Sequence, residues 1–160
     1  MASCLVGSEM CIRDRKNNCH FDFERRNLIL DDRNEVNVID FQDMCIAPIG
    51  IDIAGILLDH YMSFDRSIIK KDLKYFLDHS DISLSEDDLF EFFRWSGIQR
   101  NMRILGTLAN LYCDEGRDFR LKDLPNILSN LTCLIPEKHN SKSFFVDKVK
   151  NKLNERLAAL

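Results

Sequence analysis

The 160-residue sequence predicts a mainly helical fold that carries one short β-hairpin near its start. Two apolar runs, at residues 28–30 and 36–39, flank a cluster of turn-forming residues at 31–34, which is the pattern of a hairpin. From Asp52 onward, the apolar residues recur at helical spacing instead. A two-stranded hairpin is marginally stable in water, so we expect it to dock on the helices that follow.

Four helices and a helical tail are expected after the hairpin. The first begins at Asp52, whose side chain is placed to act as its N-cap. The second covers about 66–79 and the fourth about 121–134, while residues 144–160 form a weaker amphipathic tail. The third begins at Ser85, because a serine followed by three acids is typical of a helix N-terminus, and it extends to Tyr112.

The third helix contains Gly97 and Gly106, where an interruption is conceivable. We interpret Arg94, Arg100 and Arg103 as an ordinary solvated face, with a substrate-binding role as the alternative. The apolar stripe of this helix is expected to face the core, and it comprises Phe92, Trp95, Ile98, Met102, Leu105, Leu108, Ala109 and Tyr112.

Composition excludes several classes of function. A net charge of −4 provides no basic face for nucleic acid, and no stretch approaches the roughly 18 uninterrupted apolar residues of a transmembrane helix. The six cysteines form no C-x-x-C pair, which favours reduced thiols in a cytoplasmic protein. A metal site at Cys19-His20 is the weaker alternative, because no further ligands accompany it. No obligate protein partner is indicated.

The first fifteen residues, MASCLVGSEMCIRDR, show neither helical nor strand periodicity and lack the apolar core of a signal peptide. They resemble a translated sequencing adapter, so we interpret them as a non-native extension. The predicted organisation is therefore an extension at 1–15, a catalytic unit at 16–135 and a helical tail at 136–160.

The residues that indicate chemistry bracket the hairpin. His20-Phe21-Asp22 precedes it, Asn27 follows Asp22 by five positions, and Asp40-Phe41 follows Asn27 by thirteen. This order and spacing match the kinase catalytic loop H-x-D-x-x-x-x-N and the later metal-binding aspartate. The full set is far more specific than any of its parts.

Each residue then has an expected role in phosphoryl transfer. Asp22 would accept the proton of the substrate hydroxyl, while Asn27 and Asp40 would supply the oxygen ligands that Mg²⁺ prefers. His20 is expected to orient the loop rather than to act as a nucleophile. Alternatively, Asp22 and Asn27 are loop residues bonded to their own backbone and Asp40 is a cap, but these interpretations do not explain the joint spacing.

The segments CHFDFERRNLIL and NVIDFQDMCIAPIGIDIAGILLD resemble the aminoglycoside phosphotransferase and choline kinase-like superfamily. Together with FRWSGIQRNMRILGTLANLY and KDLPNIL, they are most similar to its bacterial kinases of N-acetylmuramate and N-acetylglucosamine, which act at the anomeric hydroxyl in cell-wall recycling. The resemblance implies a kinase-like C-terminal lobe, ATP and Mg²⁺ as cofactors, and an amino-sugar substrate. It also implies that Asp52 buttresses the catalytic loop. It identifies no substrate-binding residue.

No Gly-rich loop, strand-borne lysine or helix-borne glutamate precedes His20, so the resemblance implies a fragment without the N-terminal lobe that would be inactive alone. Two other functions stay open. One is an aminoglycoside or other small-alcohol kinase, although the mixed charges of the third helix do not form the acidic surface that suits polycations. The other is a non-catalytic kinase-like binding module.

Deleting residues 1–15 is expected to change the free energy of unfolding by no more than roughly 0.5 kcal/mol, because a terminus without periodicity buries little surface. Urea denaturation of both forms measures the difference. Strong destabilisation would show that the extension belongs to the fold. Both forms are expected to aggregate or bind hydrophobic dyes, and to show no Mg²⁺-dependent kinase activity.

Overall fold

The computed structural model describes residues 16–58, 63–118 and 120–157. Residues 1–15, predicted to be a non-native extension, lie outside the described residues. The strands are β1 (Lys16–Cys19), β2 (Leu28–Leu30), β3 (Val36–Val38) and β4 (Cys45–Pro48). The α-helices are α2 (Gly50–Leu57), α3 (Arg66–Asp78), α4 (Glu86–Glu115), α5 (Leu124–Leu134), α6 (Ser141–Ser143) and α7 (Asn151–Leu157). Short 3-10 turns occupy Arg25–Asn27, Phe41–Asp43 and Leu121–Asp123, and a π-helix occupies Phe144–Lys150.

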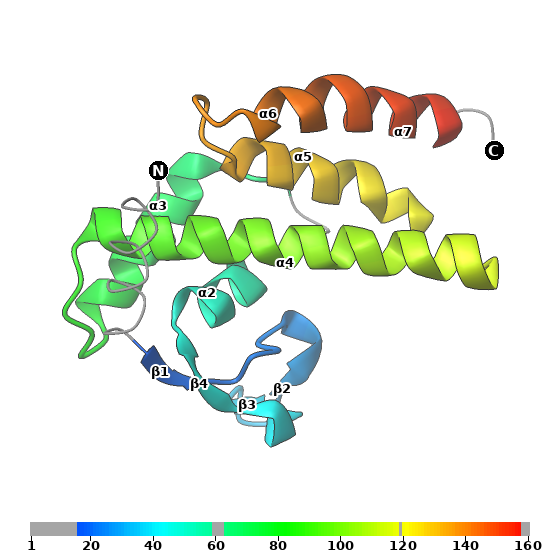
Figure 1. The fold of residues 1–160 in the computed structure, drawn as a ribbon. Helices are drawn as coiled ribbons and strands as arrows, with labels where there is room; N and C mark the ends of the chain where they lie inside the picture. Colours follow the sequence, from blue (N-terminus) through cyan, green and yellow to red (C-terminus); the bar gives the residue numbers. More distant parts are fainter. Residues whose placement is uncertain (1–15, 59–62, 119, 158–160) are drawn as a thin grey trace.

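The long helix α4 is the centre of the fold. The strands and α2 lie on one side of it, and α5 and the C-terminal helices lie on the other (Figure 1). The prediction of a mainly helical protein with a small β component is confirmed, while the assignment to a kinase C-terminal lobe stays a prediction. None of the described helices combines the length and apolar character needed to cross a membrane.

The predicted hairpin is present, with β2 and β3 paired antiparallel from Leu28 opposite Val38 to Leu30 opposite Val36. Its turn forms because Asp31 Oδ1 accepts hydrogen bonds from the backbone N–H groups of residues 33 and 35, at 2.8 and 2.9 Å. The expectation that helices cover the hairpin is wrong for its apolar side chains, since Leu30 and Val36 are 65% and 60% exposed. Backbone and side-chain hydrogen bonds at Ile39, described below, attach the hairpin instead.

A second antiparallel pair, β1 with β4, was not predicted. Lys16 lies opposite Pro48 and Cys19 lies opposite Cys45, so the pair joins the residues just before the catalytic motif to those just after it. The sequence of β1, KNNC, has no apolar alternation that would indicate a strand. Pairing with a distant segment, rather than local preference, therefore forms β1.

Helix α2 begins at Gly50, two residues before the predicted start. The prediction that Asp52 is its N-cap is wrong, because Asp52 lies inside the first turn. Its carboxylate oxygens accept hydrogen bonds from the backbone of residues 20 and 21 and are thus directed away from the N-terminus of their own helix. Asp52 therefore forms a tertiary contact with the loop before the hairpin and does not cap its own helix.

Helix α4 begins where predicted, after Ser85, whose Oγ accepts a hydrogen bond from the backbone N–H of Asp88 at 3.1 Å. It runs unbroken for 30 residues, through both Gly97 and Gly106, and is capped by Gly116 in the left-handed conformation. Gly97 is instead a point of close packing. A Cβ at this position would lie 2.4 Å from Leu58 Cδ1, which shows that the neighbouring side chain occupies the space.

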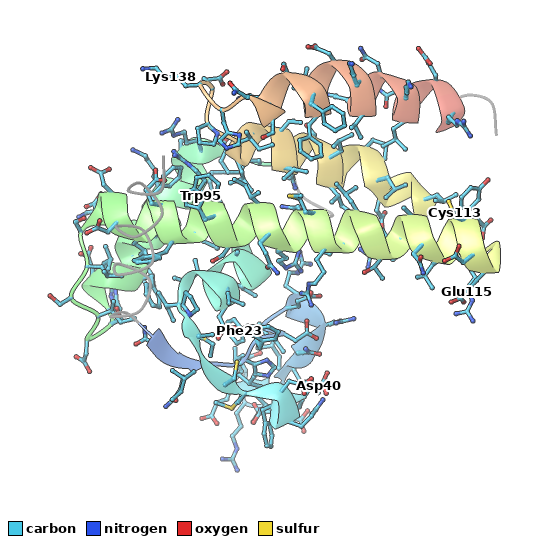
Figure 2. All side chains as sticks on the ribbon, in the orientation of Figure 1. Phe23, Asp40, Trp95, Cys113, Glu115 and Lys138 are labelled. Carbon is cyan, nitrogen blue, oxygen red and sulfur yellow. The ribbon has the colours of Figure 1, made fainter. Side chains whose placement is uncertain are left out.

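The predicted buried stripe of α4 is only partly correct. Ile98 and Leu108 are buried, but Trp95 and Met102 are about half exposed, at 49% and 48%. The reason is that α4 contacts α2, α3 and α5 around its circumference, so its buried residues do not follow one face (Figure 2). The buried residues of α4 are Leu89, Phe90, Phe93, Gly97, Ile98, Arg100, Asn101 and Leu108.

Substitution of Gly55 by alanine is expected to destabilise the protein by about 1–3 kcal/mol, because a Cβ there would lie 2.3 Å from the backbone oxygen of Phe23. Gly106 is the matched control, since nothing lies within 4 Å of its Cβ position in the middle of α4. Gly106→Ala should stabilise by about 0.5–1 kcal/mol. Urea denaturation measures both, and equal effects would contradict a close contact at Gly55.

Candidate active site

The loop at residues 20–27 lies between β1 and β2, and we call it the catalytic loop after the motif that it carries. One carboxylate anchors it to α2. Asp52 Oδ2 accepts a hydrogen bond from the backbone N–H of His20 at 2.6 Å, and Oδ1 accepts one from Phe21 at 2.8 Å. Phe21 has a φ of 72°, a value uncommon for a bulky residue. The two charge-assisted hydrogen bonds hold the loop in this conformation at the position immediately before Asp22.

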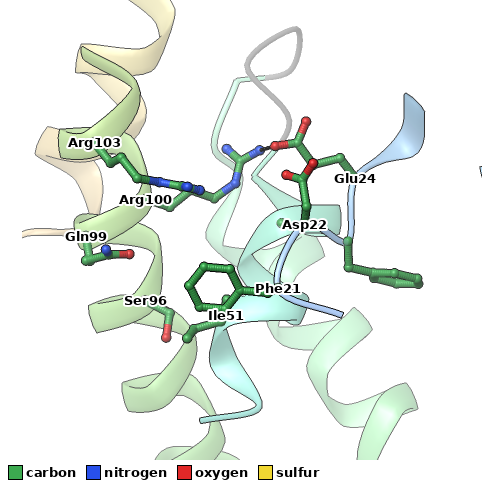
Figure 3. Close-up of a pocket in the computed structure, with 10 residues that line it drawn as sticks. Phe21, Asp22, Glu24, Ile51, Ser96, Gln99, Arg100 and Arg103 are labelled. Carbon is green, nitrogen blue, oxygen red and sulfur yellow. Dashed lines mark hydrogen bonds and ion pairs between the residues drawn. The ribbon is translucent and has the colours of Figure 1, made fainter. Parts of the chain in front are cut away.

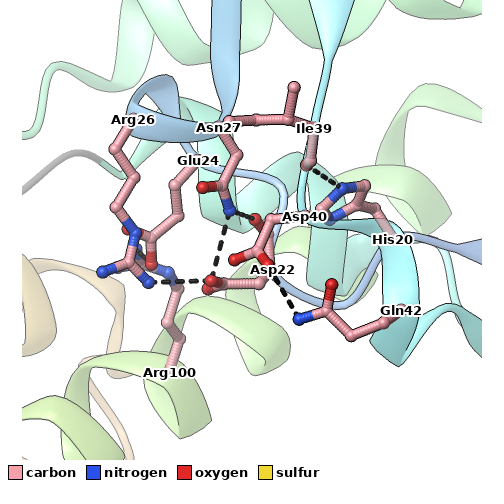
Figure 4. A network of polar contacts seen from close by, with 9 residues as sticks. All are labelled: His20, Asp22, Glu24, Arg26, Asn27, Ile39, Asp40, Gln42 and Arg100. Carbon is pink, nitrogen blue, oxygen red and sulfur yellow. Dashed lines mark hydrogen bonds and ion pairs between the residues drawn. The ribbon is translucent and has the colours of Figure 1, made fainter.

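His20 connects this loop to the segment after the hairpin. Its side chain is 7% exposed, and Nε2 donates a hydrogen bond to the Ile39 carbonyl at 2.9 Å (Figure 4). The backbone N–H of Ile39 in turn donates to the Asn27 carbonyl at 3.0 Å. Asp40, the next residue, is thereby brought beside Asn27.

Asn27 is buried and binds the catalytic-loop aspartate directly. Its Nδ2 donates to the backbone oxygen of Asp22 at 2.8 Å and to Asp22 Oδ2 at 3.3 Å (Figure 4). Nδ2 is thus engaged with Asp22, and the side-chain oxygen is the atom of Asn27 that remains to bind another group. The geometry thus presents Asn27 as both a support for Asp22 and an available oxygen donor.

Asp40 lies at the end of the hairpin in a left-handed conformation, with φ 66° and ψ 41°. Its side chain is exposed, and Oδ1 accepts a hydrogen bond from Gln42 Nε2 at 2.7 Å. A non-glycine residue with positive φ persists only where its surroundings impose it, and such residues cluster at functional sites. The structure therefore brings Asp22, Asn27 and Asp40 together through the contacts of His20 and Asp52, while the roles of these five residues stay predictions.

A chain of charged side chains, which sequence reasoning missed, links the catalytic loop to α4. Arg26 pairs with Asp22 Oδ2 at 2.7 Å and with Glu24 Oε2 at 3.3 Å, and Arg100 pairs with Glu24 Oε1 at 2.6 Å (Figure 4). The Arg100 side chain is only 7% exposed, so its interpretation as part of a solvated face is wrong. Arg100 lies three residues after Gly97 and therefore on the same side of α4, and this spacing could have indicated that Arg100 is buried.

These contacts set the charge of Asp22. Partial burial of the Asp22 carboxyl raises its pKa, but the hydrogen bond and charge of Arg26 and the hydrogen bond from Asn27 outweigh burial. The pKa of Asp22 therefore lies below its ordinary value, and the side chain is ionised at neutral pH. An ionised carboxylate can accept a hydrogen bond from a substrate hydroxyl.

Cys19 precedes this loop but does not share its chemistry. Burial, and then the nearby Asp52 charge, raise the pKa of the Cys19 thiol to about 11. Its Sγ lies 3.3 Å from the Ala47 carbonyl, to which the thiol donates. A protonated, buried thiol is a poor nucleophile at neutral pH. Within the described part of the chain, no group of three or more His, Cys, Asp or Glu side chains is placed to hold a metal ion.

Two cavities border Asp22. One of about 90 Å³ lies between the catalytic loop and α4 (Figure 3). The other, of about 450 Å³, lies between the catalytic loop and the segment after Asp40. The first is lined by Phe21, Asp22, Phe23, Glu24, Ile51, Gly55, Ser96, Gln99, Arg100 and Arg103, and the second by Phe21, Asp22, Arg26, Asp43, Cys45 and Arg103.

Comparison with known proteins agrees with the motif. Residues 11–82 match the phosphotransferase enzyme family. An N-acetylmuramate/N-acetylglucosamine kinase from Neisseria meningitidis is 30% identical over 117 residues, which cover 70% of this chain and 35% of that protein. A protein of the same name from Pseudomonas aeruginosa is 27% identical over 124 residues, or 74% of this chain and 36% of that protein. The chain thus spans about a third of the length of these relatives.

Replacing Arg26 with glutamine is expected to raise the pKa of Asp22, because the variant loses the cation that stabilises the carboxylate. NMR titration of the side-chain carboxyl signals measures the shift. The contribution of Asp22 to stability is present above its ordinary pKa and is lost as pH falls through the lower folded-state pKa. Because the folded-state pKa of Asp22 rises toward its ordinary value in the variant, this contribution should be smaller in the variant than in the parent.

Asp31 is the internal control for this titration. Backbone hydrogen bonds from Glu35 and Arg33 lower the pKa of Asp31, and Arg26 takes no part in them. Its titration should therefore be the same in both proteins. An unchanged Asp22 midpoint, or equal shifts at both aspartates, would contradict a specific effect of Arg26.

Proposed function

We propose, on the premise that the chain shares its catalytic segment with the phosphotransferase enzyme family, that the protein carrying it transfers the γ-phosphate of ATP to a hydroxyl of a small molecule. The observation that supports this most strongly is the convergence of Asp22, Asn27 and Asp40 through hydrogen bonds between segments on both sides of the hairpin. Polar loop residues with unrelated roles would not need hydrogen bonds that hold them next to one another.

Asp22 is proposed as the residue that receives the acceptor hydroxyl. With its pKa lowered, the carboxylate is a weak base, so its main contribution is to orient the hydroxyl oxygen toward the phosphorus. It would take the proton as the new phosphorus–oxygen bond forms and the bond to the departing ADP breaks. This agrees with the largely positional catalysis of phosphoryl transfer.

Asn27 and Asp40 are proposed to hold Mg²⁺. Mg²⁺ is usually bound by one or two carboxylates together with substrate phosphates, and not by a complete cage of protein ligands. One exposed carboxylate next to one amide oxygen fits that requirement. When bound with ATP, the ion would neutralise charge on the phosphates. His20 and Asp52 would hold the segments that carry Asn27 and Asp40 in fixed positions.

The amino sugar N-acetylglucosamine or N-acetylmuramate is proposed as the acceptor, with its anomeric hydroxyl as the reacting group. The names of both relatives support this choice. The cavities beside Asp22 contain Arg26, Arg100 and Arg103 as well as acidic groups, and such mixed charge is unfavourable for a polycationic aminoglycoside. An aminoglycoside or other small-alcohol kinase, and a non-catalytic binding module, are the alternatives.

Asp40→Ala, in the complete gene product that carries this chain, is expected to abolish Mg²⁺-dependent ADP release with N-acetylglucosamine, because a metal ligand is lost. Asp22→Asn should lower kcat by about 10²–10⁴-fold while ATP still binds. Asp32→Ala, in the exposed hairpin turn, is the control and should keep parental activity. Parental turnover by Asp40→Ala, or turnover of aminoglycosides well above amino sugars, would contradict the proposal.

A further inference from the structure

The acceptor must bind in a space that Asp22 borders, because a hydroxyl has to reach its carboxylate at hydrogen-bond distance. Both cavities at Asp22 share Phe21, Asp22 and Arg103. Arg103 therefore lies where the two spaces meet, on the α4 side of the catalytic loop (Figure 3). Neither the motif nor the relatives assign a residue of α4 to this site.

The wall that α4 contributes is polar and regularly spaced. Ser96, Gln99 and Arg103 follow one another at intervals of three and four residues, so they lie along one side of the helix (Figure 3). Phe21 and Ile51 provide apolar surface opposite them. A wall of hydroxyl and amide groups facing apolar surface suits a sugar, which has both hydroxyl groups and apolar ring faces.

Three arginines line these cavities, but two of them are already engaged. Arg26 pairs with Asp22 and Glu24, and Arg100 pairs with Glu24 from a buried position. The Arg103 side chain is exposed and forms no hydrogen bond or ion pair with any of the residues that the structure describes. Arg103 is thus the cation available to a ligand at this site.

We propose that Arg103 is a specificity-determining residue that binds a carboxylate on the acceptor. This inference rests on the proposed function. N-acetylmuramate carries a lactyl ether with a carboxylate, which N-acetylglucosamine lacks, and the two sugars are otherwise alike. The planar guanidinium of arginine binds a carboxylate through two parallel hydrogen bonds, so Arg103 would favour the acidic sugar over the neutral one.

The test compares both sugars in the complete gene product that carries this chain, by ADP release. Arg103→Gln is expected to lower kcat/KM for N-acetylmuramate by about 10–100-fold, the range for loss of a hydrogen bond to a charged group, mainly through KM. For N-acetylglucosamine, kcat/KM should change by less than about threefold. Arg103→Lys should restore part of the loss, because it keeps the charge but not the paired hydrogen bonds.

Arg117→Gln is the matched control, since it removes the same charge from an exposed arginine just beyond the end of α4. Equal urea midpoints for all variants verify that folding is unchanged. Calorimetric binding of N-acetylmuramate without nucleotide should weaken in Arg103→Gln, weaken less in Arg103→Lys and stay unchanged in Arg117→Gln. If the parent is active on both sugars and Arg103→Gln lowers kcat/KM equally for both, or for neither, the inference about Arg103 is overturned and the proposed function is not. A parent inactive on both would overturn the proposed substrate.

Discussion

The carboxylate of Asp52 joins α2 to the catalytic loop through the backbone N–H groups of His20 and Phe21, and the geometry of the candidate site depends on this contact. It fixes the loop just before Asp22. One turn further along α2, Gly55 allows the Phe23 backbone to lie directly on the helix. From the fixed loop, His20 reaches the Ile39 carbonyl and so positions Asp40. Displacement of α2 would therefore move the proposed base and both proposed metal ligands.

The charged groups extend this arrangement to α4. Arg100 is buried, so its ion pair with Glu24 offsets the cost of removing its charge from water. Glu24 also binds Arg26, which binds Asp22. The charge on the proposed base is thereby coupled to Arg100 of α4, which is 76 residues from Glu24 in sequence. Removing Glu24 would leave the buried charge of Arg100 without this partner and would also change the surroundings of Asp22.

The features that the sequence predicted well are those decided by neighbouring residues. The turn at Asp31 and the start of α4 at Ser85 each depend on side-chain hydrogen bonds within four positions. The catalytic motif was recognisable because its spacing is local to the hairpin. The β1–β4 pair, the true partners of Asp52 and the burial of Arg100 depend on residues 26 or more positions apart, for which local periodicity carries no information.

The left-handed backbone at Asp40 sets the stability of the fold against the metal-binding role that we propose for its carboxylate. Glycine adopts this conformation at no steric cost, whereas aspartate tolerates it better than most residues but still with some strain. Selection for folding alone would therefore favour glycine at residue 40, because glycine would remove the steric strain there. The proposed role of the carboxylate in binding Mg²⁺ would be the reason to keep aspartate there. In a copy of the gene freed from its function, this position is among the first where drift toward glycine would be expected.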